Sequence, residues 1–298
     1  MIVSILDKTS GFFSMLFFVI NHYIYCSKNN INFTLNTDNW LFKYKRGWED
    51  YFENIDINFN ENDNIITYVT PDKILSDYKI IDYKEIINKF YIYNSSTYNS
   101  ILDIKKKLNI TDKNYDSIFI RRGDKLINES IYINASEYIN VLLKKNPNCT
   151  TIFLQTDDYN CYLEIEEYIN INNLNIKLLT ICDENSKGFI VFNKHLNSIK
   201  NLNIENKLNH DYVKLNINNI TNISVEQMND LDIYNHTINM IIGIDIVLNS
   251  NICITDYSSN VARFIKLAHN NSNNVHDLRF YETDIEYEKI HCPSYSFY

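Results

Sequence analysis

The chain has 298 residues, a formal net charge of −9, a hydrophobic fraction of 45% and an aromatic fraction of 14%. This composition can fill one large core or two ordinary ones, so we expect a folded protein rather than a disordered chain. The acidic balance argues against a nucleic-acid binder, because such a protein needs a basic face to neutralise phosphates. A local basic pocket would still concentrate a small anion.

Neither the cysteines nor the apolar runs predict a metal site or a membrane anchor. The six cysteines, at positions 26, 149, 161, 182, 253 and 292, lack the spacing of metal ligands. Several lie in apolar runs, and we expect these to be reduced core residues. The apolar run 12–20 is interrupted by Asn21 and His22, which makes it too short to span a bilayer. With no signal peptide evident, we expect a cytoplasmic protein.

The first half of the chain begins with the pattern of a β-turn-α-β unit. Residues 2–6 predict a strand, a turn that contains Gly11 follows, residues 12–26 predict a helix, and residues 31–35 predict a second strand. This order is typical of a Rossmann-like half domain. The turn alone is a weak signal, because it lacks the full GxGxxG motif.

An aromatic-rich loop, a strand and helices complete the first half. Trp40 and Trp48 lie in the loop, where core packing is their simplest role. Residues 65–69 predict a strand, and residues 72–108 predict helices that end in a basic run. The polar stretch 109–115 has the composition of a connector. We therefore expect two domains, residues 1–112 and 113–298.

The second half alternates strands with helices, which is the pattern of a parallel sheet. Asn134 and Glu137 have the spacing of a capping box at the start of one helix. The expected strands are residues 117–121, 151–154, 176–181 and 251–255. The expected helices are residues 136–145, an acidic helix that ends at residue 169, and residues 225–248 and 260–269.

Polar residues follow three of these strands and should meet at one edge of the sheet, where the carboxyl ends of parallel strands lie. Guanidinium groups opposite a helix N-terminus would bind a diphosphate, because arginine matches phosphate oxygens and the first N–H groups of a helix point outward. Taken alone, the arginines could be surface charges and the serines helix caps. The residues concerned are Arg121, Arg122, Asp157, Asp158, Asp256, Ser258 and Ser259.

Asp157 and Asp158 could also be read as metal ligands. We expect no metal there, since the arginines would pair with both carboxylates directly. Displacing a nucleoside diphosphate from a sugar builds negative charge on the departing phosphate. Fixed guanidinium and helix N–H groups would stabilise that charge without a metal.

Three segments in the second half resemble the peptide motifs of the GDP-fucose-dependent fucosyltransferases. Residues 118–125, IFIRRGDK, with Glu129 four residues on, resemble the first motif of the α1,2-, α1,6- and protein O-fucosyltransferases, and most closely that of the core α1,6-fucosyltransferase and chitooligosaccharide fucosyltransferase group. Residues 153–158 are similar to the second motif, and residues 245–278 to the third and its sequel. Segments around Gly11, Trp40 and Trp48 also agree, so the resemblance covers most of the chain in order.

The resemblance implies a GT-B-like α/β fold, in which two Rossmann-like domains with parallel sheets face each other across a cleft. It implies inverting transfer of fucose from GDP-fucose to a hydroxyl of a glycan acceptor, with no cofactor besides the donor and no metal. The partners would be a nucleotide-sugar donor and a glycan, with no nucleic acid and no membrane span.

Family roles carried onto matching positions give each candidate residue a task. Glu129 would be the catalytic base, helped by Lys125, and Arg121 would contact the β-phosphate. Asp124 would hold the arginine turn in place. The other implied donor-binding residues are Arg122, Asp157, Asp158, Asp245 at the guanine, Ser258, Ser259, Asn260, Gly11, and Tyr44 near the ribose.

The sequence departs from the family pattern at three points. Phe119 stands where the α1,6 group has a histidine near the guanine, and the segment from Asp245 to Ser259 is shorter than the family pattern. The spacing of the tryptophan loop also differs, which leaves Tyr44 or Phe42 as the ribose neighbour. Two alternatives therefore stay open: another nucleotide-sugar donor on the same scaffold, or a non-catalytic carbohydrate- or nucleotide-binding protein.

Overall fold

The computed structural model describes six stretches of the chain, residues 2–6, 10–56, 80–110, 114–124, 132–191 and 224–278. These stretches form two compact units that divide after Ser100. The division falls inside helix α3 (Ser95–Leu108), whereas the sequence predicts the boundary slightly later, in the polar connector. Among the described residues, no helix has the length and hydropathy needed to cross a membrane.

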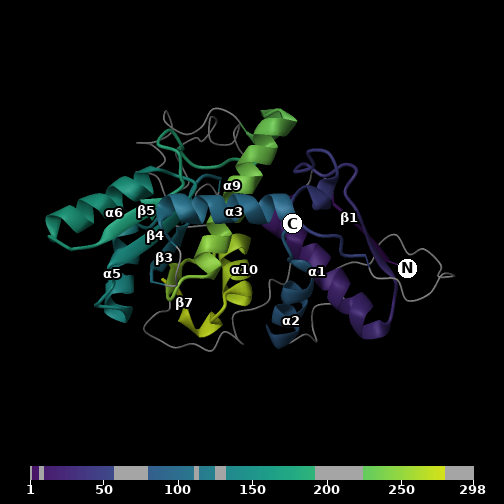
Figure 1. The fold of residues 1–298 in the computed structure, drawn as a ribbon, viewed down its shortest axis with the longest axis horizontal. Coiled ribbons are helices and arrows are strands. Elements are labelled where there is room, and N and C mark those ends of the chain that lie inside the picture. The colour runs from purple at the N-terminus through teal and green to yellow at the C-terminus, as the bar shows by residue number, and fades with distance from the viewer. Residues whose placement is uncertain are drawn as a thin grey trace, which may run out of the picture. The chain divides into compact units, whose positions relative to one another are not determined.

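The first unit contains the predicted β-turn-α-β arrangement. Strand β1 (Ile2–Ile5) pairs in parallel with β2 (Phe33–Asn36), and helix α1 (Phe12–Asn29) connects them (Figure 1). The helix continues three residues beyond its predicted end at Cys26. It ends at Asn30, which adopts the left-handed conformation, with φ of 53°, that asparagine tolerates better than most residues.

Aromatic packing builds the core of this unit around α1. The Phe12 ring lies 5.3 Å from that of Trp40, and Trp48 stacks on Phe52 at 4.4 Å between centroids. Both tryptophans are buried, which confirms their predicted packing role. Helix α2 (Ile80–Phe90) also packs against α1. The strand expected at residues 65–69 lies outside the described residues.

A single carboxylate holds the loop before the short helix η1 (Gly47–Asp50). Asp50 is buried and accepts hydrogen bonds from four consecutive backbone N–H groups, at 2.9 to 3.0 Å. These N–H groups belong to Tyr44, Lys45, Arg46 and Gly47. Gly47 has φ of 75°, and a Cβ atom there would overlap the Thr37 side chain, so glycine is required.

The second unit contains a five-stranded parallel sheet of order β5-β4-β3-β6-β7. All four predicted strands are present, while the last strand was not predicted. Strand β3 lies in the middle and every one of its residues is buried. The strands are β3 (Asp116–Ile120), β4 (Thr151–Thr156), β5 (Lys177–Thr180), β6 (Cys253–Thr255) and β7 (Val275–Asp277).

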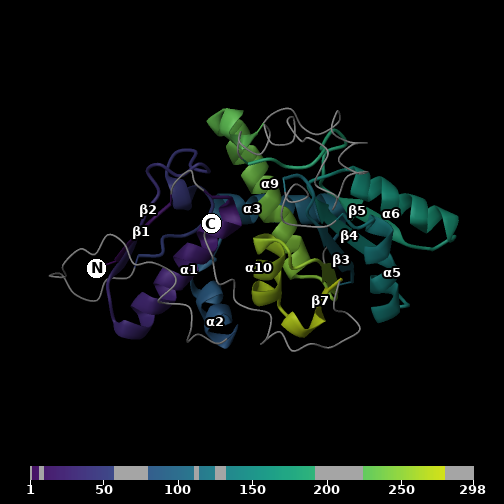
Figure 2. The ribbon, with the colours of Figure 1, turned by 180° about the vertical axis from the view of Figure 1, so that it is seen from behind.

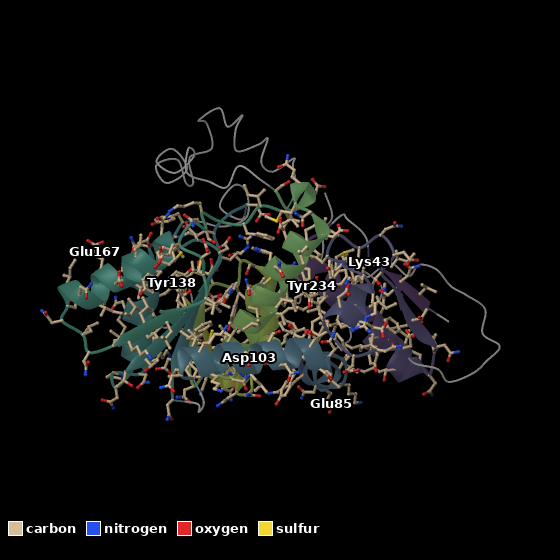
Figure 3. The ribbon with its side chains drawn as sticks, turned by 45° about the horizontal axis from the view of Figure 1, so that its top comes forward. Lys43, Glu85, Asp103, Tyr138, Glu167 and Tyr234 are labelled. Atoms are coloured by element: carbon tan, nitrogen blue, oxygen red, sulfur yellow. The ribbon has the colours of Figure 1, made fainter. Side chains whose placement is uncertain are left out.

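Helices cover both faces of this sheet (Figures 1 and 2). Helices α5 (Ala135–Lys145) and α6 (Asn160–Ile171) pack together on one face, and α9 (Asp230–Leu248) and α10 (Asn260–Ala268) pack together on the other. Tyr138 of α5, labelled in Figure 3, is buried in the core between its helix and the sheet. This topology reverses the strand order between β3 and β6.

Local signals set the ends of these helices. The Asn134 side chain caps α5 by accepting from the Ser136 N–H at 2.9 Å, rather than from the Glu137 N–H that the predicted capping box would use. The helix expected at residues 225–248 is divided, because Met228 is extended and Asn229 starts α9 as a new N-cap.

The four cysteines buried in the described residues are free thiols, in agreement with the prediction: Cys26, Cys149, Cys161 and Cys253.

We predict that Asp50→Ala lowers the free energy of unfolding by about 3 kcal/mol, because four backbone donors lose a charged acceptor. Urea denaturation of the full chain measures this change. The matched control is Asp38→Ala, which removes a carboxylate 79% exposed and 3.7 Å from Lys43, and should cost less than about 0.5 kcal/mol. Equal effects of the two substitutions would contradict the structural role of Asp50.

Candidate functional site

A cavity of about 360 Å³ opens at the carboxyl ends of β3 and β4. Strand β3 contributes Phe119 and Ile120, and β4 contributes Gln155 and Thr156. The loop that follows β5 and the middle of α9 line the cavity from other sides. Because the strand order reverses next to β3, this is where doubly wound folds bind their ligands.

The three predicted strand ends do converge on this edge of the sheet. Strands β4 and β6 flank β3 in parallel register, so Arg121, Asp157 and Asp256 follow neighbouring strands. The sequence-based expectation of one shared edge is therefore confirmed. Arg121 and Asp157 line the cavity, together with Val261 in the first turn of α10.

The Arg121 guanidinium is held by several acceptors at once. Its Nη1 donates to Asp157, and its Nη2 donates to Asp124 at 2.5 Å and to the Phe189 carbonyl at 2.9 Å. The guanidinium carbon also lies 5.5 Å from the centre of the Phe189 ring. The pairing of Arg121 with Asp157 was expected from the sequence, because a guanidinium withdrawn from water takes the acceptors within reach. Asp124 thus contacts the arginine that the resemblance assigns to it, and its role in the turn stays a prediction.

Arg122 points away from the cavity into the protein. Its side chain is only 2% exposed and binds the Glu164 carboxylate through both terminal nitrogens, at 2.9 and 2.7 Å. It also lies 3.6 Å from Asp158 and over the Tyr132 ring. The structure therefore does not bring the Arg122 guanidinium to the cavity beside Arg121.

Asp157 connects three parts of the site. Its Oδ1 accepts from the Arg122 backbone N–H at 2.8 Å, and its Oδ2 accepts from the Phe189 N–H at 2.8 Å as well as from Arg121. Its carbonyl accepts from the Gly188 N–H at 2.9 Å. These bonds tie the ends of β3 and β4 to the loop that lines the cavity.

Asp158 has its own partners within the protein. Its side chain accepts from the Asn160 N–H at 3.0 Å, next to the start of α6, and lies near Arg122. Among the described residues, no group of three His, Cys, Asp or Glu side chains has the arrangement of a metal site. Both aspartates pair with arginine or backbone donors, and the expectation that they bind no metal stays a prediction.

Two glycines let the cavity loop approach the end of β3. Gly123 and Gly188 have φ of 52° and 92°, in the region that favours glycine. A Cβ atom on Gly188 would lie 2.7 Å from the Gly123 Cα, and one on Gly123 would lie 2.2 Å from the Phe189 carbonyl oxygen. Larger residues would push Phe189 away from Arg121.

The predicted serine pair forms the start of α10. Ser259 is buried and caps the helix by accepting from the Ala262 N–H at 3.2 Å, while Ser258 donates to Asp256 at 3.0 Å. Asn260 accepts from Arg263 at 3.1 Å. The helix-cap role is thus present at Ser259, and the role of all three residues toward a phosphate stays a prediction.

The remaining candidates are distributed over other parts of the structure. Asp245 is near the C-terminus of α9, paired with Lys105 at 2.5 Å, and does not line the cavity. Gly11 is the N-cap of α1, and Tyr44 lies in the loop held by Asp50; both belong to the first unit. Lys125 and Glu129 lie outside the described residues.

Sequence reasoning missed two aromatic residues of the cavity, Phe189 and His236. Their rings stack at 4.1 Å with an angle of 3° between planes. Burial, and secondarily the positive charge of Arg121, lowers the pKa of His236 to about 4. Neither residue belongs to a recognisable sequence motif. Phe189 follows a glycine in a region without clear periodicity, and His236 lies on α9, two residues after Tyr234 (Figure 3).

Solved structures share this fold. The fucosyltransferase NodZ from Bradyrhizobium, in its selenomethionine form, matches with a TM-score of 0.51 and 8% identity, covering 90% of this chain and 91% of that chain. A second NodZ structure matches with a TM-score of 0.50 and 9% identity, covering 90% and 92%. No protein-family model and no curated protein matches the sequence. At this identity the likeness shows the fold alone, which is the α/β GT-B-like fold with parallel sheets.

We predict that His236 makes the protein less stable as the pH falls from about 6.5 toward about 4. In this pH window His236 is protonated in the unfolded chain but stays neutral in the folded protein, because folding lowers its pKa. Proton binding therefore favours the unfolded chain. The loss in Tm between pH 7 and pH 5 should therefore be smaller for His236→Asn than for the unsubstituted protein. Identical losses would show that His236 does not titrate as its surroundings imply.

Proposed function

We propose that the protein is a glycosyltransferase that binds a nucleotide-sugar donor in the cavity at the ends of β3 and β4. The observation that carries this proposal is the position of Arg121 at the switch point of a GT-B-like fold, beside a cavity of about 360 Å³. The fold of NodZ fucosyltransferase supports the class of reaction. More specifically, we propose inverting transfer of fucose from GDP-fucose to a hydroxyl of a glycan.

In this proposal Arg121 acts on the leaving group. As the bond between the sugar and the diphosphate breaks, negative charge grows on the β-phosphate, and a fixed guanidinium stabilises it without reorganising. Asp124, Asp157 and the Phe189 carbonyl fix the orientation of Arg121. The diphosphate would take the place of one of these acceptors. The proposed reaction uses no metal, because the positive charge of Arg121 and the N–H groups at the start of α10 would stabilise the negative charge on the phosphate.

Glu129 is the proposed general base, with Lys125 beside it. A carboxylate near the anomeric carbon would take the proton from the acceptor hydroxyl as the new bond forms. Such a base typically accelerates a reaction by about a hundredfold or more. The assignment rests on the spacing from Arg121 in the sequence motif.

A second candidate is transfer of a different sugar from another nucleotide on the same scaffold. The observation in its favour is Phe119, which lines the cavity and is buried, at the position where the α1,6-fucosyltransferase group has a histidine near the guanine. A phenyl ring provides no hydrogen bond to a nucleobase, so the nucleobase of the donor need not be guanine.

We predict that the full chain binds GDP more tightly than UDP or CMP in buffer that contains EDTA. Isothermal titration calorimetry with the three nucleotides measures the preference and the need for a metal. Arg121→Ala should weaken GDP binding by about tenfold or more, because the diphosphate loses a charged partner. Preference for UDP would support the second candidate, and no binding of any nucleotide would refute both. Binding only after Mg²⁺ or Mn²⁺ is added would refute the metal-free proposal.

We predict that Glu129→Gln leaves the Kd for GDP within about twofold but lowers turnover about a hundredfold or more, since only the proton acceptor is lost. The measurement is transfer from GDP-fucose to a panel of glycan acceptors, beginning with chitooligosaccharides. Arg121→Ala serves as the contrast, because it should lower both affinity and turnover. Near-normal transfer by Glu129→Gln would exclude Glu129 as the base.

A further inference from the structure

The carboxamide of Gln155, on β4, lines the cavity and has an unpaired acceptor. Its register partner on β3 is Phe119, so the two side chains project from the same face of the sheet, and both line the cavity. Gln155 is partly exposed, but its Oε1 atom is enclosed and accepts no hydrogen bond from any described residue. An enclosed polar atom without a partner is an exception in folded proteins, and protein packing does not explain this one.

Helix α9 is shaped to accommodate this carboxamide. The helix packs against β3 and β4, and a Cβ atom on Gly243 would overlap the Oε1 and Nε2 atoms of Gln155. His236 and Asn239 also line the cavity, and they share a helix face with Gly243 because the three residues are spaced three and four positions apart. The Gln155 amide therefore lies at the end of a row of polar side chains along α9.

The Gln155 amide is available to a ligand because it is not committed to the protein at its oxygen. The terminal torsion of a glutamine side chain is soft, so the amide can turn from Gly243 toward the cavity. This turn breaks no hydrogen bond at Oε1. Asp157, by contrast, accepts from Arg121 and from two backbone N–H groups, so the protein already uses its oxygens.

The position of Gln155 in the sheet separates it from the proposed phosphate contact. It is level with Phe119, which precedes Arg121 by two residues, or about 7 Å along a strand. The amide and the Arg121 guanidinium would thus contact different parts of one ligand. For a nucleotide whose diphosphate lies at Arg121, the part available to Gln155 is the nucleoside.

We propose that Gln155 binds the nucleobase of the donor, with Oε1 accepting from N1–H of guanine and Nε2 donating to O6. This inference rests on the proposed function, in which GDP is the leaving group. A carboxamide has an acceptor and a donor side by side, which match a ring N–H next to a carbonyl oxygen. Gln155 thereby supplies the hydrogen bonds that Phe119, its neighbour on β3, cannot make.

The test measures the binding of GDP and of GDP methylated at N1 by isothermal titration calorimetry, in buffer that contains EDTA. Gln155→Met keeps the length of the side chain and removes its hydrogen-bonding groups. The matched control is Gln227→Met, at the other glutamine of the chain. Gln227 is exposed, does not line the cavity, and accepts from the Ser224 N–H at 3.2 Å.

The unsubstituted protein and Gln227→Met should bind GDP at least about tenfold more tightly than the methylated nucleotide, which has lost the N1–H donor. Gln155→Met should bind GDP about tenfold more weakly than the unsubstituted protein, and should bind the two nucleotides within about threefold of each other. Its Tm should not fall, because the substitution removes an unpaired polar atom. The lost affinity would then report the lost contact rather than unfolding.

Two results would overturn the assignment of Gln155 while leaving the proposed function intact. One is equal binding of GDP and the methylated nucleotide by the unsubstituted protein. The other is a Gln155→Met protein that still discriminates between them as strongly as Gln227→Met does. Absence of GDP binding by the unsubstituted protein would instead refute the proposed donor, and this inference with it.

Discussion

The Asp157 carboxylate is the interaction on which the edge of the central sheet depends. It accepts from the Arg122 backbone, from the Phe189 backbone and from the Arg121 side chain, so it joins β3, β4 and the cavity loop. A parallel sheet aligns the ends of its strands but does not by itself fix the loops beyond them. One carboxylate with several donors does so, because each lost donor would be left without its acceptor in a largely dry site.

The charges of this edge explain how an acidic protein maintains fixed cations. The guanidinium groups of Arg121 and Arg122 are surrounded by four carboxylates, those of Asp124, Asp157, Asp158 and Glu164. The arginines divide these partners between them, so one remains at the cavity and the other is buried under α6. Adjacent residues in the sequence consequently have different environments. Arg121 lies where it can contact a ligand, whereas Arg122 binds Glu164 inside the protein.

Close approach of the backbone is the second requirement of the site. Gly123 and Gly188 let the cavity loop lie against the end of β3, which brings Phe189 over Arg121 and against His236. The resulting column of Arg121, Phe189 and His236 links the central strand to α9. Burial in this column keeps His236 neutral, so Arg121 supplies the positive charge there near neutral pH.

The amino-acid pattern alone predicts the alternation of strands and helices, the parallel sheet of the second unit and the convergence of Arg121, Asp157 and Asp256 on one edge. These features follow from local periodicity and from a general rule for parallel sheets. Three further features emerge only from the folded chain: Arg122 turns inward to Glu164, Asp245 pairs with Lys105 away from the cavity, and Phe189 and His236 complete the cavity lining. Side-chain direction and pairing between distant residues depend on packing, which no local pattern encodes.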